Sequence, residues 1–93
     1  MVLEVTGALW YWRGPAPWYF VTVPDEESGA LREVAAGVTY GWGMVPVMAT
    51  IGDTTWTTSL WPQEDRYVIP VKAAIRRSER LEEGDPVTVR LSL

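Results

Sequence analysis

Residues 2–12 alternate between two kinds of side chain, which is the period-two pattern of a β-strand. One face of the predicted strand carries Leu3, Val5, Leu9 and Tyr11. The other face carries Glu4, Thr6, Trp10 and Trp12. Prolines and a glycine within 13–17 end this strand. Because the β-rich run 18–23 follows, the pattern predicts a hairpin with an irregular loop.

Two segments change to the spacing of an amphipathic helix. The segment 25–36 begins with acidic residues, which favour a helix N-terminus, and Gly37 ends it. Its expected buried face is Leu31, Val34 and Ala35. A second short helix is predicted over 72–81, and its expected buried residues are Ala74, Ile75 and Leu81.

The remaining strands are expected at 45–51, 54–60, 67–71 and 87–93. Gly52 and Asp53 form a hairpin turn between the first two, and the polar segment 62–66 is expected as a turn. Short strands with two short helices predict a mostly β fold, a small closed or double-split β-barrel that occupies 1–93 as one domain. We expect its interior to contain Val47, Ile51, Ile69, Val87, Val89 and Leu91.

Composition removes several kinds of chemistry. The 93 residues include no Cys and no His, so thiolate chemistry and the commonest general base and metal ligand are missing. Asp53, Glu64 and Asp65 lie in predicted turns, where water keeps carboxylates ordinary. We therefore expect no catalytic residues, no metal site and no cofactor.

Charge and hydropathy restrict the partners. With 12 acidic and 8 basic residues the formal net charge is −4, which opposes binding to the phosphate backbone of nucleic acids. Apolar runs stay far below the ~20 residues needed to cross a bilayer, and the N-terminus lacks the basic start of a signal peptide. We expect no nucleic-acid or membrane partner, and a cytoplasmic location.

The segment 67–93 is the most specific stretch of the sequence. A strand ends in proline, a helix follows, and Gly84 with Asp85 turns the chain into a last strand. This order resembles an element of the AbrB-like, or swapped-hairpin, regulators. The chain as a whole resembles the DUF1905 family, a domain of unknown function, at 18–24, 41–47, 51–60, 67–77 and 82–89. The resemblance implies a double-split β-barrel and no established catalytic residue.

Aromatic residues form the first candidate site. Six Trp residues are many for so short a chain. Large aromatics can fill a core, or they can line a cleft in which indole N–H groups orient a ligand. Together with hydroxyl residues between 54 and 59, the aromatic set is Trp10, Trp12, Trp18, Tyr40, Trp42, Trp56 and Trp61. The walls expected for a small apolar or aromatic ligand are Trp10, Trp12, Trp42 and Trp56.

Two of these tryptophans raise a question of cover. Trp10 and Trp12 lie opposite the predicted interior face of the first strand, and two bare indoles would make an apolar patch that monomers rarely tolerate. The cover can be the first helix, a second subunit or a ligand.

Basic residues form the second candidate site. Lys72, Arg76 and Arg80 follow one another at intervals of four, which places them on one face of the second predicted helix. They can bind an anion, or they can pair with nearby acids as an ordinary solvated face. The acids in question are Glu79, Glu82, Glu83 and Asp85. A DNA-facing surface is a third alternative, by analogy with the regulators, and the acidic total opposes it.

These observations leave three hypotheses about function. The first is a non-enzymatic binding or interaction domain, with a small molecule or a protein as its partner. The second is a small biosynthetic enzyme or pathway accessory that shapes an apolar substrate in an aromatic cleft. The third is a DNA-binding regulator, which rests on fold analogy alone. The absence of His and Cys favours the first.

Overall fold

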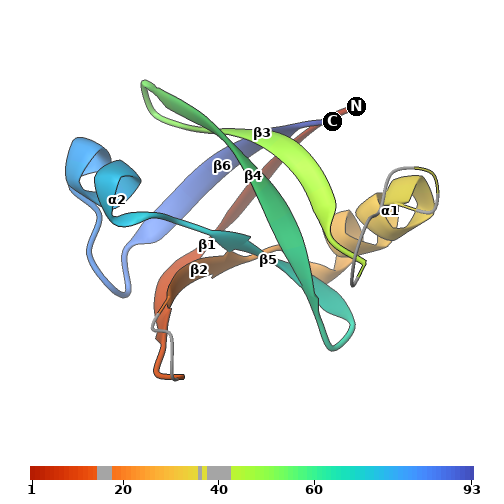
Figure 1. Cartoon of the computed structure of the whole chain (residues 1–93), viewed down its shortest axis with the longest axis horizontal. Helices are drawn as coiled ribbons and strands as arrows, with labels where there is room; N and C mark the ends of the chain where they lie inside the picture. The colour runs from red at the N-terminus through yellow and green to blue at the C-terminus, as the bar shows by residue number, and fades with distance from the viewer. Residues whose placement is uncertain (15–17, 36, 38–42) are drawn as a thin grey trace.

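The computed structural model describes residues 1–14, 18–35, 37 and 43–93. Strands and two helices follow one another along these residues (Figure 1). The strands are β1 (Val2–Trp12), β2 (Trp18–Thr22), β3 (Val45–Ile51), β4 (Thr54–Gln63), β5 (Arg66–Pro70) and β6 (Pro86–Ser92). The helices are α1 (Asp25–Ala35) and α2 (Ala73–Glu79).

The strands close into an antiparallel barrel in the order β1-β2-β5-β4-β3-β6. The first and last strands pair from Val2 opposite Ser92 to Ala8 opposite Pro86, so the two termini lie together (Figure 1). Closure removes the open edges that short apolar strands would otherwise expose. The predicted small, closed, mostly β barrel with two short helices is confirmed.

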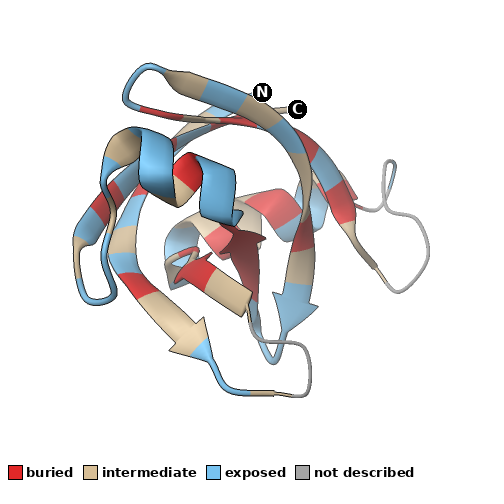
Figure 2. Ribbon diagram, turned by 60° about the vertical axis from the view of Figure 1, so that its left-hand side comes forward, coloured by how far each residue is buried: buried red, intermediate tan, exposed pale blue. Residues whose placement is uncertain are grey.

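Aliphatic side chains fill the barrel. The residues predicted to lie inside are all buried: Val47, Ile51, Ile69, Val87, Val89 and Leu91. Val5 and Leu9 of β1 are buried as well, on the face that the alternation assigned to the interior. Buried and more exposed residues alternate along β3 and β6, as the red segments of Figure 2 show. Period two therefore predicted the inner face of these strands correctly.

Helix α1 packs against β5 through a buried serine. The buried residues of α1 are Ser28, Leu31 and Ala35, whereas Val34 is half-buried. The Ser28 hydroxyl donates to the carbonyl oxygen of Val23 at 3.0 Å and accepts from the backbone N–H of Tyr67 at 3.2 Å. Because the Ser28 hydroxyl both donates and accepts a hydrogen bond, its burial leaves no polar group unpaired, and the two bonds connect α1 to the barrel wall.

Helix α2 is shorter than the predicted 72–81. Lys72 and Arg80 flank it as cap residues, and Arg80 adopts a left-handed backbone with φ 55°. Ile75 is buried as predicted, but Ala74 is exposed, so its predicted burial is wrong. A helix of two turns presents one apolar position to the barrel, and Ile75 fills that position. Within the described residues, neither helix has the length and apolar character needed to cross a membrane.

One of the two predicted hairpin turns is as expected, and the other is shorter. Gly52, with φ 55°, lies in the expected hairpin turn between β3 and β4. The polar turn expected at 62–66 is shorter, because β4 continues to Gln63 and only Glu64 and Asp65 connect it to β5. Glu64 adopts φ 55°, the left-handed backbone that two-residue hairpin turns favour.

Candidate functional site

Most of the described tryptophans lie on the outer face of the barrel wall. Leu9 of β1 and Val21 of β2 are opposite each other and buried, so the residues that alternate with them face outward. On β4 the buried residue is Leu60, and its neighbour therefore faces outward too. The aromatic residues of this outer face, which we call the outer aromatic cluster, are Trp10, Trp12, Trp18, Phe20 and Trp61.

Phe20 is the centre of the outer aromatic cluster. Its ring centroid lies 5.2 Å from that of Trp10 and 5.2 Å from that of Trp61. Trp18 stacks on it at 6.3 Å and meets Trp61 edge to face at 5.0 Å. These rings leave Phe20 only 3% exposed although it faces away from the barrel interior. The cluster is therefore a second, small apolar core outside the main one.

The cover of Trp10 comes from the barrel wall itself. Its ring lies against Phe20, and its indole N–H donates to the Thr22 hydroxyl at 2.8 Å. Trp12 is the most open member of the cluster, with 40% of the residue exposed. It borders a hollow of about 150 Å³ that Trp61 and Gln63 also line.

Trp56 lies on the inner side of the wall. It is opposite the fully buried Ala49 and packs against the main core. In the described part of the chain, its indole N–H is the one buried side-chain polar atom with no hydrogen-bond partner. The predicted ligand walls are thus separated by the barrel wall, since Trp10 and Trp12 face outward and Trp56 inward. Trp42 and Tyr40 lie outside the described residues.

Four cations lie in helix α2 or at its ends, and we call them the basic segment: Lys72, Arg76, Arg77 and Arg80. The ion pairs within the described residues are Arg66 with Asp25 and Arg90 with Glu4. None of these pairs includes the basic segment. Four of the chain's eight cations are therefore close together in sequence without a carboxylate partner in the described structure.

Two of the four acids considered as partners of the basic segment, Glu79 and Asp85, have other contacts. Glu79 accepts a hydrogen bond from the Thr54 hydroxyl at 2.6 Å, which ties α2 to β4. Asp85 accepts from the backbone N–H of Glu82 at 2.8 Å and so closes the turn before β6. In the described residues, no ion pair joins these acids to the basic segment.

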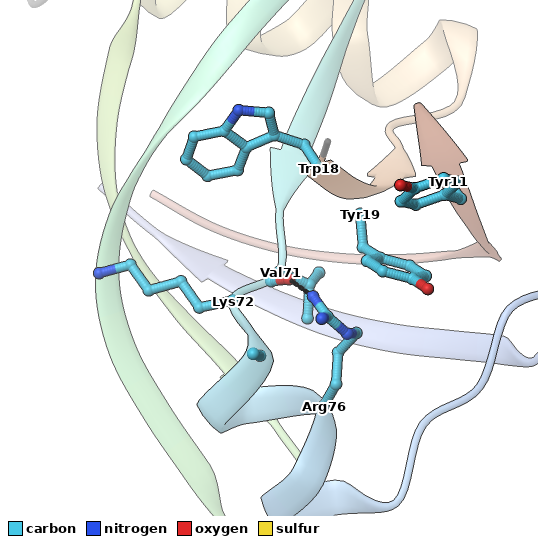
Figure 3. Close-up of a pocket in the computed structure, with 7 residues that line it drawn as sticks. Tyr11, Trp18, Tyr19, Val71, Lys72 and Arg76 are labelled. Carbon is cyan, nitrogen blue, oxygen red and sulfur yellow. Dashed lines mark hydrogen bonds between the residues drawn. The ribbon is translucent and has the colours of Figure 1, made fainter. Parts of the chain in front are cut away.

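A cleft opens at one end of the barrel, where β1 and β2 approach α2 (Figure 3). Its volume is about 470 Å³, and its lining is Tyr11, Trp18, Tyr19, Val71, Lys72, Ala73 and Arg76. Figure 3 shows the Trp18 indole above Val71, with the two tyrosine rings to the right. Tyr11 and Tyr19 are opposite each other on β1 and β2, with their ring centroids 4.9 Å apart. The first hairpin thus supplies aromatic walls, and α2 with its N-cap residue supplies the cations.

Arg76 is held in place on this cleft. Its guanidinium carbon lies 3.8 Å from the centroid of the Tyr19 ring, a cation–π contact. Its Nη1 group donates to the carbonyl oxygen of Val71 at 2.7 Å (Figure 3). Besides Lys72 and Arg76, a further cation contacts a wall of the cleft, since the guanidinium of Arg13 lies 5.4 Å from the Tyr11 ring centroid. These contacts orient Arg76 and occupy only part of its donor set.

The predicted anion patch is brought together only in part. Lys72 and Arg76 line the cleft, whereas Arg80 lines a second hollow next to it. Arg76 belongs to both linings, so it connects the two hollows.

The carboxylates considered as candidate acids, and the ion pair of Asp25 with Arg66, lie away from the cleft lining. Asp25 and Arg66 approach to 2.5 Å, and the hydrogen bond from Arg66, followed by its charge, lowers the pKa of the Asp25 carboxyl below its ordinary value. Asp53, Glu64 and Asp65 are exposed, as expected for turn residues. In the described residues, carboxylates do not gather in groups of three or more that could hold a metal ion.

Sequence analysis missed the two tyrosines of the cleft. Tyr11 was placed on the inner face of the first strand, and its position at the strand's end was the signal that it borders the barrel opening. Its partner Tyr19 and the cation Arg76 come from other elements, and no local pattern connects them.

Comparison with known proteins gives a family but no function. The family profile that matches residues 6–91 is DUF1905, described as a domain of unknown function. No curated protein matches the chain.

Proposed function

The chain belongs to the DUF1905 family, and we propose that it is a non-enzymatic binding domain whose cleft takes a small organic anion with a flat apolar or aromatic group. The flat group lies between Trp18 and the tyrosine pair, and the anionic group meets Lys72 and Arg76. The cleft contains Lys72 and Arg76 of the predicted anion patch. From the wider aromatic set it contains Trp18, and the predicted ligand walls Trp10, Trp12 and Trp56 are not among its described lining residues.

The observation that carries the proposal is that Arg76 is half-buried and has no carboxylate partner among the described residues. The residue is half-buried against Tyr19 and Val71, yet no carboxylate among the described residues pairs with it. A guanidinium in that position is already desolvated in part and restricted in its rotamers, so binding an anion costs little further ordering. The exposed Arg66 and Arg90, in contrast, both have acidic partners.

The walls of the cleft determine the other half of the ligand. Aromatic faces and edges favour a flat apolar group, and small-molecule sites combine such walls with a few polar groups that fix orientation. Among the described residues, the lining contains no carboxylate, serine or threonine, which favours binding over general acid–base or nucleophilic catalysis. Phenylacetate is a simple probe because it combines a ring with a single carboxylate.

The test is an NMR titration of the ¹⁵N-labelled protein with phenylacetate, phenylacetamide and acetate. Phenylacetate is expected to shift the Trp18 indole N–H and the Arg76 Nε–H resonances. Phenylacetamide, which has the ring without the charge, is expected to bind about tenfold more weakly, since a charge-assisted hydrogen bond contributes about 1.5–3 kcal/mol. Acetate has no ring and is expected to bind weakly as well.

Two variants with the same change of charge make the control. Arg76→Gln is expected to remove phenylacetate binding, whereas Arg90→Gln, on β6 beside Glu4, leaves it unchanged. Equal affinities for phenylacetate and phenylacetamide would contradict the proposal, and so would shifts confined to Trp10, Trp12 and Trp61, which do not line the cleft.

A further inference from the structure

The second hollow extends the cleft along α2. Its volume is about 310 Å³, and its lining is Ala73, Arg76, Arg77, Arg80, Leu81 and Glu82. Ala73 and Arg76 line both hollows, so the two adjoin at these residues, and we call them together the depression. The aromatic side chains lie at one end of this depression and Arg80 at the other.

The charges along the depression are unequal. Lys72 stands at the aromatic end, Arg76 in the middle, and Arg77 and Arg80 at the far end, where Glu82 is the single acid of the lining. A protein with net charge −4 thus has four cations, close together in sequence, that line two adjoining hollows. Such a concentration raises the local positive potential despite the acidic total.

From this arrangement we infer that the ligand is a ring joined to a chain of phosphate groups, the chemistry of a nucleoside diphosphate or triphosphate. The inference rests on the proposed function, because it assigns the ligand class of the same cleft. The ring lies at Trp18 and the tyrosines, the first phosphate meets Lys72 and Arg76, and the outer phosphates reach Arg77 and Arg80.

The number and type of cations favour phosphates over a single carboxylate. One carboxylate beside Lys72 and Arg76 leaves the guanidiniums of Arg77 and Arg80 without a partner. Guanidinium groups present a planar fork of donors that matches phosphate oxygens, and three of the four cations are arginines. The Glu82 carboxylate subtracts from this attraction without cancelling it, because three arginines share its hollow.

The experiment compares ligands of increasing phosphate number in a buffer that contains EDTA and no divalent cation. Adenosine, AMP, ADP and ATP are titrated by calorimetry, with inorganic tripolyphosphate as the ligand without a ring. We expect affinity to rise about five- to tenfold from AMP to ADP, since one further charge-assisted contact is gained. Tripolyphosphate is expected to bind at least about tenfold more weakly than ATP, because base stacking on aromatics contributes about 1–3 kcal/mol.

Variants at the far end separate the inference from the proposed function. Arg77→Gln and Arg80→Asn are expected to reduce the affinity for ADP about fivefold or more and to leave the affinity for phenylacetate unchanged. Asparagine is chosen at position 80 because it tolerates the left-handed backbone there. Arg90→Gln is the control of equal charge change and is expected to alter neither affinity.

Each other outcome overturns a definite part. If phenylacetate binds through Arg76 but ADP binds no more tightly than AMP, the phosphate-chain inference is wrong and the proposed function stands. If neither phenylacetate nor AMP binds, both are wrong. If tripolyphosphate binds as well as ATP, the aromatic walls have no part in recognition. If a single-stranded oligonucleotide binds far more tightly than ATP, the ligand is a nucleic acid and the inference fails.

Discussion

The two sides of the barrel wall are packed with different kinds of side chain. The interior is built mainly from valine, leucine, isoleucine and alanine contributed by every strand, together with the buried Tyr67 of β5. The outer aromatic cluster has one phenylalanine and four tryptophans, all from β1, β2 and β4. Each region has a residue that is almost completely buried, with Val89 at 0% and Phe20 at 3% exposed, but the tryptophans around Phe20 are half-buried or exposed.

The difference follows from the space available. A closed barrel of six strands has a narrow interior, and the branched aliphatic side chains fill it without leaving polar atoms unpaired. Indole rings are larger and carry an N–H group, so they fit better on the outside, where Trp10 reaches the Thr22 hydroxyl. Trp56, the described indole on the inner side, has a buried N–H group without a hydrogen-bond partner in the described structure. We therefore expect changes inside to have larger effects than changes outside.

The largest effect is expected from a charge in the interior. Val89→Asp should lower the free energy of unfolding by about 4 kcal/mol or more, since Val89 is fully buried and the new carboxylate has no partner. The matched control is Thr88→Asp on the exposed neighbour, with a loss of about 1 kcal/mol. Urea denaturation followed by circular dichroism measures both. Equal unfolding midpoints for the two variants would show that β6 does not face the interior as described.

The next effect tests whether the outer aromatic cluster is a true second core. Phe20→Ala should lower the free energy of unfolding by about 3 kcal/mol, because three tryptophan rings lose their central contact. Trp12→Ala serves as the comparison and should cost less than about 1 kcal/mol, since the ring is 40% exposed. A loss of unfolding free energy at position 20 as small as that at position 12 would mean that the cluster does not stabilise the fold as a second core. The same denaturation assay decides the matter.

A smaller effect distinguishes the two indole N–H groups. Trp10→Phe removes a hydrogen bond of 2.8 Å, whereas Trp56→Phe removes a buried donor without a partner in the described structure. Because the change in ring size is the same, Trp10→Phe is expected to cost about 1 kcal/mol more than Trp56→Phe. Thermal unfolding of the two variants in parallel provides the measurement. The opposite order would show that the Trp56 N–H has a partner in solution, such as a bound water.

The smallest effect concerns a charge pair outside both regions. The Arg66 hydrogen bond lowers the pKa of the Asp25 carboxyl from its ordinary 3.8, so the pair contributes stability above that pH and loses it as the pH falls through the lowered value. Arg66→Gln should therefore be slightly less stable than the original protein at neutral pH, with the difference disappearing in acid. Both side chains are exposed, so added salt should also reduce the difference. A difference that grows in acid would contradict the assignment; thermal unfolding across pH measures it.

Several details of the fold could be predicted from local patterns and others could not. Gly52 indicated its hairpin turn because a glycine suits the left-handed backbone there. Glu64 adopts the same left-handed backbone, but a glutamate in the sequence does not indicate this conformation. The β4/β5 turn was therefore predicted too long. Ser28 was not expected in a core, because its burial depends on Val23 and Tyr67 from outside its own helix.

By itself, the sequence determined which face of β1, β3, β5 and β6 turns inward, because side chains of a strand alternate and the apolar face must be buried. That rule placed Val87, Val89 and Leu91 inside and Trp10 outside. Tertiary structure decided which of these faces meet. Closing the barrel placed Tyr19 of the first hairpin beneath Arg76 of α2 and put Trp56 on the other side of the wall from Trp10. Such neighbours depend on strand order and register between distant segments, whereas periodicity describes only one segment at a time.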